Sequence, residues 1–301
     1  MEGGSGVLGK LLADTMRSQG IKGRGLASAI ASKYVTIRHL TIPVMPKKDL
    51  KKAVIWEFRK GTDLGSGDFV CDFVILEEVD RASGKFYSII VFGVRKDDVL
   101  DLIGIFKGTS REVVAVDVIP MALLGSFDLN NTWEDGPSYA VIDIGESSST
   151  LVILKNKKMQ FAREIMVGGG NITKAVADGM LSNEESAEEE KIRCGLSKKA
   201  DNPKVMEFII PLIDRLINEI SLSFDYYLAQ FREGALDRIY LSGGSSMLKG
   251  LEEYISSILN IPCFVDDPLR NVKIPKRIDT GSIKQCLPAL SVAVGLATRR
   301  A

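Results

Sequence analysis

The apolar residues in the first third of the chain switch between helical and strand spacing. Over 7–19 they recur every three to four positions, which predicts a helix. Residues 26–43 favour two short strands or one bent strand, and a helix is expected over 50–60. Two apolar-rich runs, 68–76 and 86–94, predict strands joined by a polar turn. With the helix and strand expected after them, these elements indicate a small α+β module.

The remainder of the chain follows a polar boundary. Residues 128–138 are rich in Asn, Asp, Gly and Pro, and three strands and a helix are predicted after them. An acidic helix comes next, where Ser182 and Glu185 have the spacing of a capping box. The run 205–231 is strongly amphipathic, and Pro211 within it predicts a kink or a later helix start. Two short strands, each followed by a helix, complete the chain.

The overall charge and the rare residues narrow the range of functions. Lys and Arg number 39, as do Asp and Glu, so no net charge draws the whole chain to nucleic acid or acidic lipid. The 4 cysteines are far apart without a CxxC pair, which favours structural thiols. The single histidine, His39, lies in an alternating stretch and is interpreted as a strand-face residue. No segment has the roughly 20 apolar residues that span a bilayer, so we expect membrane association only through partners.

The stretch VIDIGESSST is the first candidate for chemistry. A strand ends at Asp143, and Gly145, Ser147 and Ser148 then form a tight turn into a second strand. Small residues in such a turn let backbone N–H groups approach a phosphate. Asp143 supplies the oxygen ligand that suits the water shell of Mg²⁺. The alternative interpretation is a plain β-hairpin with a polar turn.

Two further glycine-rich turns follow in the second half of the chain. In VGGGNIT, Gly168 and Gly169 lead into a helix, which is a common way to bring backbone close to a nucleotide. In YLSGGSSML, Gly243 and Gly244 let a flat base lie against the main chain, and a helix is expected to begin at the serines. The alternatives are a loop that needs positive φ and an ordinary βα turn.

Glu188 and Lys191 are predicted to lie on one face of the acidic helix, three residues apart. A carboxylate and an ammonium at that spacing suit ribose hydroxyls, whereas the alternative is a solvated charged face. Each motif is weak by itself. An Asp-x-Gly hairpin, a glycine-rich helix start, an acidic helix and a strand-Gly-Gly turn, in that order, are typical of the actin-like ATPases.

At a finer level the chain resembles the type IV pilus assembly PilM family, which is related to the cell-division protein FtsA. The resemblance runs from about Leu11 to the C-terminus through LTIPVMPKKDLKKAVIWEF, DFVCDFVIL, IIVFGVRKDDV, VVAVDVIPMAL, VIDIGESSSTLVIL, FAREIMVGG, SAEEEK, YLSGGSSMLKGL and ALSVAVGLA. It implies an α/β, actin-like fold. Two ribonuclease-H-like lobes would surround a nucleotide cleft, with a small inserted α+β subdomain.

The resemblance also implies a division of the chain. The first lobe would comprise 1–41 and 105–135, the inserted subdomain 42–104, and the second lobe 136–301 with a helical part at about 180–232. The family normally opens with a strand that carries its own Asp-x-Gly phosphate loop, followed by two more strands. The sequence begins instead within the first helix. We therefore expect an N-terminally incomplete first lobe and weakened nucleotide binding.

The same resemblance implies roles for the candidate residues, with ATP and Mg²⁺ as cofactors and Asp143 as the residue nearest the metal. The residues implied to meet the phosphates and Mg²⁺ are Asp143, Gly145, Ser147 and Ser148. Those implied to line the cleft are Gly168 and Gly169. Those implied to meet the ribose are Glu188 and Lys191, and those implied to meet the adenine are Gly243, Gly244 and Met247.

The implied function is a cytoplasmic ATP-binding scaffold of the pilus assembly complex, peripheral to the inner membrane through partners. Its expected partners are the cytosolic N-terminal segment of a PilN-like inner-membrane protein and other pilus assembly proteins. The segment would dock on the inserted subdomain as an added strand or an apolar plug. The alternatives are an actin-like ATP hydrolase and a filament-forming protein like FtsA. No catalytic residue is assigned, because hydrolysis needs a group that orients water and no carboxylate stands in a convincing context.

Overall fold

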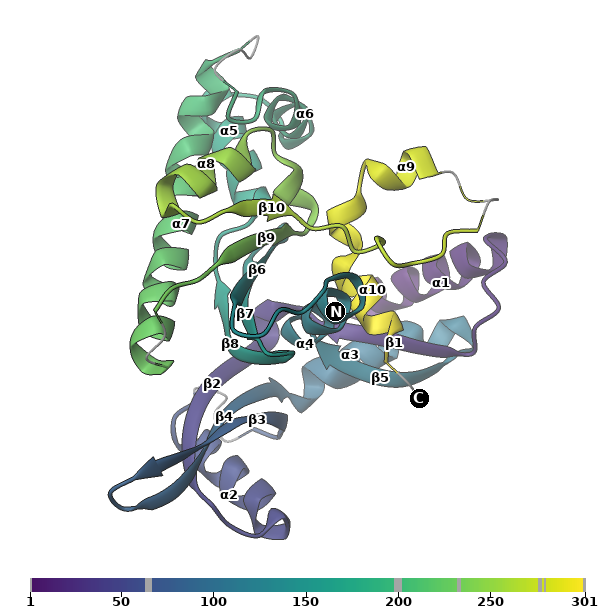
Figure 1. The fold of residues 1–301 in the computed structure, drawn as a ribbon. Coiled ribbons are helices and arrows are strands. Elements are labelled where there is room, and N and C mark those ends of the chain that lie inside the picture. Colours follow the sequence, from purple (N-terminus) through teal and green to yellow (C-terminus); the bar gives the residue numbers. More distant parts are fainter. Residues whose placement is uncertain are drawn as a thin grey trace. The chain divides into compact units, whose positions relative to one another are not determined.

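The computed structural model describes residues 2–62, 67–197, 202–231, 234–275, 278 and 280–299 (Figure 1). The chain forms two compact units. The first unit comprises the chain up to Ile119 together with the C-terminal segment from Leu296, and the second unit comprises Pro120–Gly295.

The first unit contains two small sheets and their covering helices. Its elements are α1 (Glu2–Ser18), β1 (Gly25–Ile30), β2 (Val35–Pro43), α2 (Lys47–Lys60), β3 (Phe69–Arg81), β4 (Gly84–Arg95), α3 (Lys96–Phe106) and β5 (Glu112–Val118). The strand β1 pairs only with β5, in parallel, and α1 packs against α3. This sheet therefore has two strands in the described part of the chain.

The other sheet of the first unit is antiparallel, in the order β2-β4-β3. One of its faces packs against α2, because Leu50, Val54 and Phe58 recur at helical spacing and are fully buried there. Leu40 and Ile89 come from the facing strands. The strands β2 and β3 are the two edges of this sheet.

The second unit is built on one mixed sheet with the order β10-β9-β6-β7-β8. Its elements are α4 (Ile119–Asn130), β6 (Ser138–Ile144), β7 (Ser149–Lys155), β8 (Lys158–Ile165), α5 (Gly169–Met180), α6 (Glu184–Cys194), α7 (Lys204–Phe231), β9 (Arg238–Ser242), α8 (Leu251–Leu259), β10 (Cys263–Val265), α9 (Thr280–Lys284) and α10 (Ser291–Ala297). The strands β6, β9 and β10 are parallel, whereas β7 and β8 continue as an antiparallel meander.

Alternation along β6 assigns its residues to the two faces of this sheet. Ala140, Ile142 and Ile144 join the core that packs under α5, α7 and α8. Tyr139 points to the opposite face, where its ring contacts Phe127 of α4 at a centroid distance of 5.5 Å. Because both faces are covered, every residue of β6 is buried, and the strand is held firmly at the point where its turn begins.

Two helix starts differ from the sequence prediction. The N-cap of α6 is Asn183, whose side chain accepts a hydrogen bond from the Ser186 N–H at 2.8 Å, so the predicted capping box at Ser182 is wrong. The serines after Gly244 form only a short 3-10 turn over Gly244–Met247, and α8 begins at Leu251. In contrast, α7 begins at Lys204 and continues through Pro211, so the later helix start predicted from this proline is wrong.

The two compact units are not the same division of the chain as the predicted lobes and inserted subdomain. The change of unit falls after Ile119, so α4 belongs to the second unit, and the three-stranded sheet begins at Val35. Assigning these segments to actin-like lobes and an inserted subdomain stays a prediction. Among the described helices, none combines the length and the apolar character needed to cross a bilayer.

Candidate functional site

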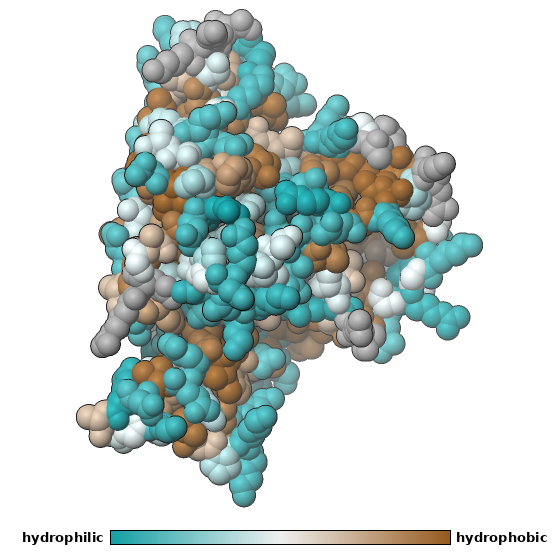
Figure 2. Space-filling view, in the orientation of Figure 1, coloured by the Kyte–Doolittle hydropathy of each residue, from teal (hydrophilic) through white to brown (hydrophobic). Residues whose placement is uncertain are grey.

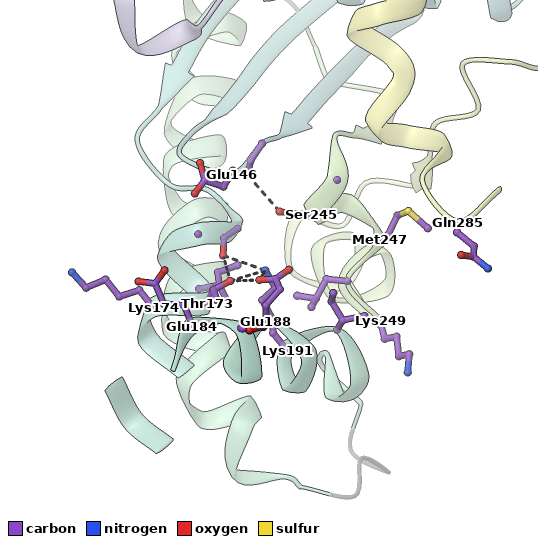
Figure 3. A pocket seen from close by; sticks show the side chains of 18 residues that line it. Glu146, Thr173, Lys174, Glu184, Glu188, Lys191, Ser245, Met247, Lys249 and Gln285 are labelled. Atoms are coloured by element: carbon purple, nitrogen blue, oxygen red, sulfur yellow. Dashed lines mark hydrogen bonds and ion pairs between the residues drawn. The ribbon is translucent and has the colours of Figure 1, made fainter. Parts of the chain in front are cut away.

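A cavity of about 740 Å³ opens in the second unit, between the β6–β7 turn, the start of α5, α6 and the 3-10 turn after β9. Its size is that of a site for a small molecule or cofactor. Figure 3 shows the side chains around it. It is lined by Gly145, Glu146, Gly169, Gly170, Ile172, Thr173, Lys174, Glu184, Glu185, Glu188, Lys191, Ile192, Gly244, Ser245, Met247, Leu248, Lys249 and Gln285.

The first wall joins the β6–β7 turn to the start of α5. The N–H of Gly169 donates to the Gly145 carbonyl at 2.8 Å, and that of Gly170 to the Glu146 carbonyl at 2.7 Å. A Cβ on Gly168 would lie 2.7 Å from the Ser148 nitrogen, so only glycine permits this close approach of the two backbones. Two glycine-rich stretches about 25 residues apart along the chain therefore form one backbone surface.

The opposite wall is the turn after β9. Gly243 has φ of 83°, and a Cβ there would lie 2.7 Å from the Ile144 carbonyl carbon, which requires glycine on both counts. The Ser245 hydroxyl donates to the Gly145 carbonyl at 3.4 Å, linking this turn to the first wall. Gly244 has no atom within 4 Å of its Cβ position, so its backbone is open to the cavity it lines.

A charged network forms the α6 side of the cavity. The ammonium of Lys191, only 6% exposed, donates to Glu188 Oε2 at 2.6 Å, to Thr173 Oγ1 at 2.9 Å and to the Gly169 carbonyl at 3.3 Å. An ammonium has three donors, so these bonds use all of them inside the protein. In Figure 3 the three side chains point toward one another below the backbone of α5.

Thr173 lies at the centre of that network. Its hydroxyl carries a single proton, which Glu188 Oε2 and the Gly169 carbonyl, 3.0 Å away, share as acceptors, while its oxygen accepts from Lys191. Burial raises the pKa of Glu188, but the hydrogen bonds from Lys191 and Thr173 and the Lys191 charge outweigh it, and the net pKa is lowered. Glu188 is therefore a carboxylate at neutral pH, and it lines the cavity.

Asp143 lies behind the turn and is 9% exposed, on the sheet face opposite to the main helical core. Its Oδ1 accepts a hydrogen bond from the Ser242 hydroxyl at 3.0 Å. Burial raises its pKa to about 6, opposed by the Ser242 hydrogen bond and assisted by the charge of Asp266. Asp143 is not among the lining residues, and its carboxylate links β6 to β9 at the base of the two glycine turns.

The serines of the β6–β7 turn divide between solvent and protein. Ser147 is exposed, Ser148 bonds to the half-buried Glu164 on β8, and the Ser149 hydroxyl donates to the Val167 carbonyl at 2.6 Å. Burial raises the pKa of Glu164, and the Ser148 hydrogen bond opposes that rise. Neither Ser147 nor Ser148 lines the cavity.

The structure thus brings the four sequence motifs together, but not every residue selected from them. The selected residues that line the cavity are Gly145, Gly169, Glu188, Lys191, Gly244 and Met247. Those that do not line it are Asp143, Ser147, Ser148, Gly168 and Gly243. The sequence analysis missed Glu146, Gly170, Thr173 and Ser245, although each stands within four residues of a selected glycine.

The chemistry of the lining fits a nucleoside with phosphates better than a metal-centred site. Glycine backbone suits phosphates or a flat base, and the Glu188 carboxylate accepts hydrogen bonds from sugar hydroxyls. Within the described part of the chain, no three His, Cys, Asp or Glu side chains gather to hold a metal ion. A magnesium ion that keeps most of its waters and binds phosphate needs only one carboxylate, so the nucleotide and not the protein would supply most of its contacts.

Comparison with known proteins identifies the family and the fold. The family described as type IV pilus assembly protein PilM matches residues 7–301. In the solved structure of a PilM-PilN type IV pilus biogenesis complex, a chain 25% identical to this one superposes with a TM-score of 0.83, covering 98% of this chain and 85% of that chain. The cell division protein FtsA of Neisseria meningitidis serogroup B is 23% identical over 321 residues, covering 95% of this chain and 74% of that protein.

The family match spans nearly the whole chain, and the structural match covers 98% of it. Both confirm the family and the actin-like α/β fold predicted from the sequence. This chain belongs to the family of the type IV pilus assembly protein PilM.

Proposed function

We propose that the chain is a cytoplasmic ATP-binding scaffold of type IV pilus assembly, peripheral to the inner membrane through a PilN-like partner. The observation that carries the nucleotide part is the meeting of Gly145, Gly169 and Gly244 with the Glu188 carboxylate around one cavity. The observation that carries the assembly part is family membership together with the likeness to a solved PilM-PilN complex.

Within the cavity, Glu188 is the proposed contact to the ribose, through the oxygen that is not used by Lys191 and Thr173. Lys191 is reassigned from a ribose contact to a positioning residue, because its three donors are already used. Gly244 and Met247 are the proposed contacts of the adenine. The β6–β7 turn is the proposed contact of the phosphates, through the backbone N–H groups of residues 146 and 147, because the Gly145 N–H already donates to the Ser148 carbonyl at 3.0 Å. Figure 3 shows Met247 on the opposite side of the cavity from Thr173 and Glu188.

Asp143 remains the proposed partner of the water shell of Mg²⁺. A bound magnesium ion would supply positive charge that balances the phosphates of ATP, and Asp143 would hold it only in the ionised form. Because the pKa of Asp143 is about 6, this carboxylate is mostly charged at pH 7.5. We expect Asp143→Asn to weaken ATP binding in Mg²⁺ and to leave binding in EDTA unchanged.

The test of ATP binding uses a side chain that fills the cavity without disturbing the fold. Gly244→Val enters open space, and Gly234→Val, also in open space but outside the cavity lining, is the matched control. Calorimetric titration should show ATP binding to the parent chain and to Gly234→Val, and a loss of at least tenfold in Gly244→Val. Equal affinity in all three would place the nucleotide elsewhere, and no binding to the parent chain would remove the proposal.

For the partner, the three-stranded sheet has the required features, since both β2 and β3 are edges to which an extended peptide can add a strand. We propose that the cytosolic N-terminal segment of a PilN-like protein binds there. A synthetic peptide of that segment, labelled for fluorescence anisotropy, should bind the purified chain. Hydrogen exchange should then show new protection along β2 or β3, whereas protection confined to the second unit would contradict this location.

A further inference from the structure

The exposed face of α2 concentrates positive charge that the balanced composition of the chain conceals. This helix has six basic and two acidic residues, although the whole chain has 39 of each sign. The basic residues are all exposed, and we call them the α2 basic face: Lys47, Lys48, Lys51, Lys52, Arg59 and Lys60. Interactions between surface charges are local, so the net charge of the chain does not cancel this face.

A tryptophan lies within the same surface. Lys48, Lys52, Trp56 and Lys60 stand four residues apart, so they follow one row along the helix. The Trp56 side chain is 62% exposed, and the Lys60 ammonium lies 3.0 Å from its ring centroid. An exposed tryptophan among cations is unusual on a merely solvated face, and tryptophan is the side chain that prefers the boundary between lipid headgroups and acyl chains.

The opposite side of α2 is already occupied. Leu50, Val54 and Phe58 are at most 3% exposed against the three-stranded sheet. Of the α2 basic face, Arg59 also contacts this sheet, with its guanidinium 5.2 Å from the Phe69 ring on β3. The helix therefore cannot turn an apolar side toward a partner helix or insert into a bilayer. The exposed side of α2 carries a row of cations about 20 Å long with one aromatic ring. Such a row is complementary to a broad anionic surface.

We propose that the α2 basic face binds the surface of anionic phospholipid bilayers, with Trp56 at headgroup depth. The contact is peripheral and independent of the nucleotide and of the PilN-like segment, since it uses neither the cavity nor the strand edges. Each cation close to such a surface adds about a factor of five to binding. Such binding is weak and reversible by itself, and it adds to whatever partner holds the chain at the membrane.

The test starts from the two tryptophans of the chain, Trp56 and Trp133. Trp133→Phe keeps an aromatic ring where Trp133 contacts Phe127 and Tyr139, and it leaves Trp56 as the only tryptophan. With this variant at low ionic strength, vesicles containing phosphatidylglycerol should shift the emission to the blue and protect it from iodide. Vesicles of phosphatidylcholine alone should do neither, and added salt should reverse the effect.

Charge variants assign the binding to this helix. Lys48→Gln with Lys52→Gln should reduce co-sedimentation with anionic vesicles by roughly 10- to 30-fold. The control with the same loss of charge, Lys157→Gln with Lys158→Gln on the exposed β7–β8 hairpin, should bind like the parent chain. Equal loss in both pairs, or no vesicle binding by the parent chain, overturns the proposal. The proposal is also overturned if soluble polyglutamate shifts the Trp56 emission to the blue while vesicles have no effect. That result would show that the α2 basic face binds an acidic polypeptide.

Discussion

At the scale of single residues, the contacts of Lys191 decide how the sugar subsite works. A lysine that lines a nucleotide cavity is commonly expected to touch the ligand, yet this ammonium is buried and is saturated by Glu188, Thr173 and the Gly169 carbonyl. Its effect on a ligand must then pass through Glu188, which it holds ionised and in place. Thr173 shares that task, since its hydroxyl bonds to both charged side chains.

Removing the Thr173 hydroxyl tests this arrangement. Thr173→Val is nearly isosteric but leaves Lys191 without one acceptor and Glu188 without one donor. We expect the dissociation constant for ATP to rise about tenfold, or about 1.4 kcal/mol. Thr173→Ser restores the hydroxyl and should return the affinity to within about twofold of the parent chain. Titration calorimetry measures both, and equal losses in Val and Ser would show that packing of the methyl group, and not the hydroxyl, matters.

The pKa of Asp143 gives a second prediction at this scale. Burial raises it from an ordinary 3.8 to about 6, so the folded protein holds a proton that the unfolded chain releases. The stabilisation that comes from the protonated Asp143 carboxyl is fully present below about pH 4, and it is lost as the pH rises through 6. Its size is about 3 kcal/mol over that window. Asp143→Asn, which keeps an acceptor for the Ser242 hydroxyl, should therefore match the parent chain near pH 4.

Above pH 6 the same variant should be the more stable protein, because it avoids a buried charge. Urea unfolding of both proteins between pH 4 and pH 8 gives the difference at each pH. A difference that does not change with pH would show that Asp143 has the same pKa in the folded and unfolded chains. Asp266→Asn is a useful companion, since removing its charge should lower the pKa of Asp143 and shift the window downward.

At the scale of secondary-structure elements, α6 positions Glu188 and Lys191, and its stability depends on its first turn. Asn183 caps the helix through the Ser186 N–H, whereas Ser182 is the residue that the sequence pattern selects. Asn183→Ala should cost about 1 kcal/mol of unfolding free energy, and Ser182→Ala should change it little. Chemical denaturation with circular dichroism compares the two. The reverse order would restore the sequence-based capping box.

Elements with strong periodicity were predictable from the sequence, and their ends were not. The amphipathic pattern of α7 follows from burial on one face, and the continuous apolar run of β4 follows from burial on both faces, as its six consecutive buried residues show; the sequence records both patterns directly. The start of α8 was missed because the 3-10 turn ends at Met247 and the helix begins only after its N-cap residue, Gly250, which has φ of 78°. Local composition does not encode such a choice between turn types.

The candidate site shows the same limit. Gly145, Gly169 and Gly244 were predictable because glycines directly after strands or before helices mark close backbone approach. The convergence of their turns depends on β6 and β9 being neighbours in the sheet, a pairing between residues about 100 positions apart. Thr173 was missed because its role comes from Lys191 and Glu188 on another helix, and nothing in the NIT tripeptide indicates that contact.

At the scale of the whole molecule, the chain combines two compact units with different tasks. In the described part of the chain, every residue that lines the cavity lies in the unit Pro120–Gly295. The α2 basic face and the open strand edges lie in the other unit. The proposed nucleotide site and the proposed contacts to membrane and partner are therefore on different compact units. Neither proposed contact surface includes a residue of the nucleotide site.

This separation predicts that ATP stabilises one unit more than the other. Each unit contains one tryptophan, Trp56 in the first and Trp133 in the second, so Trp133→Phe and Trp56→Phe report on the units one at a time. At an ATP concentration of 100 times the dissociation constant, a protein that binds only when folded gains about 2.7 kcal/mol. The Trp133 signal should show that gain in urea unfolding, and the Trp56 signal should not change. Equal shifts of both signals would mean that the units unfold as one cooperative block or that the nucleotide also contacts the first unit. The same measurement with Gly244→Val is the control for an effect of ATP on the solvent. A shift that depends on ATP binding should disappear in this variant, whereas a solvent effect should remain.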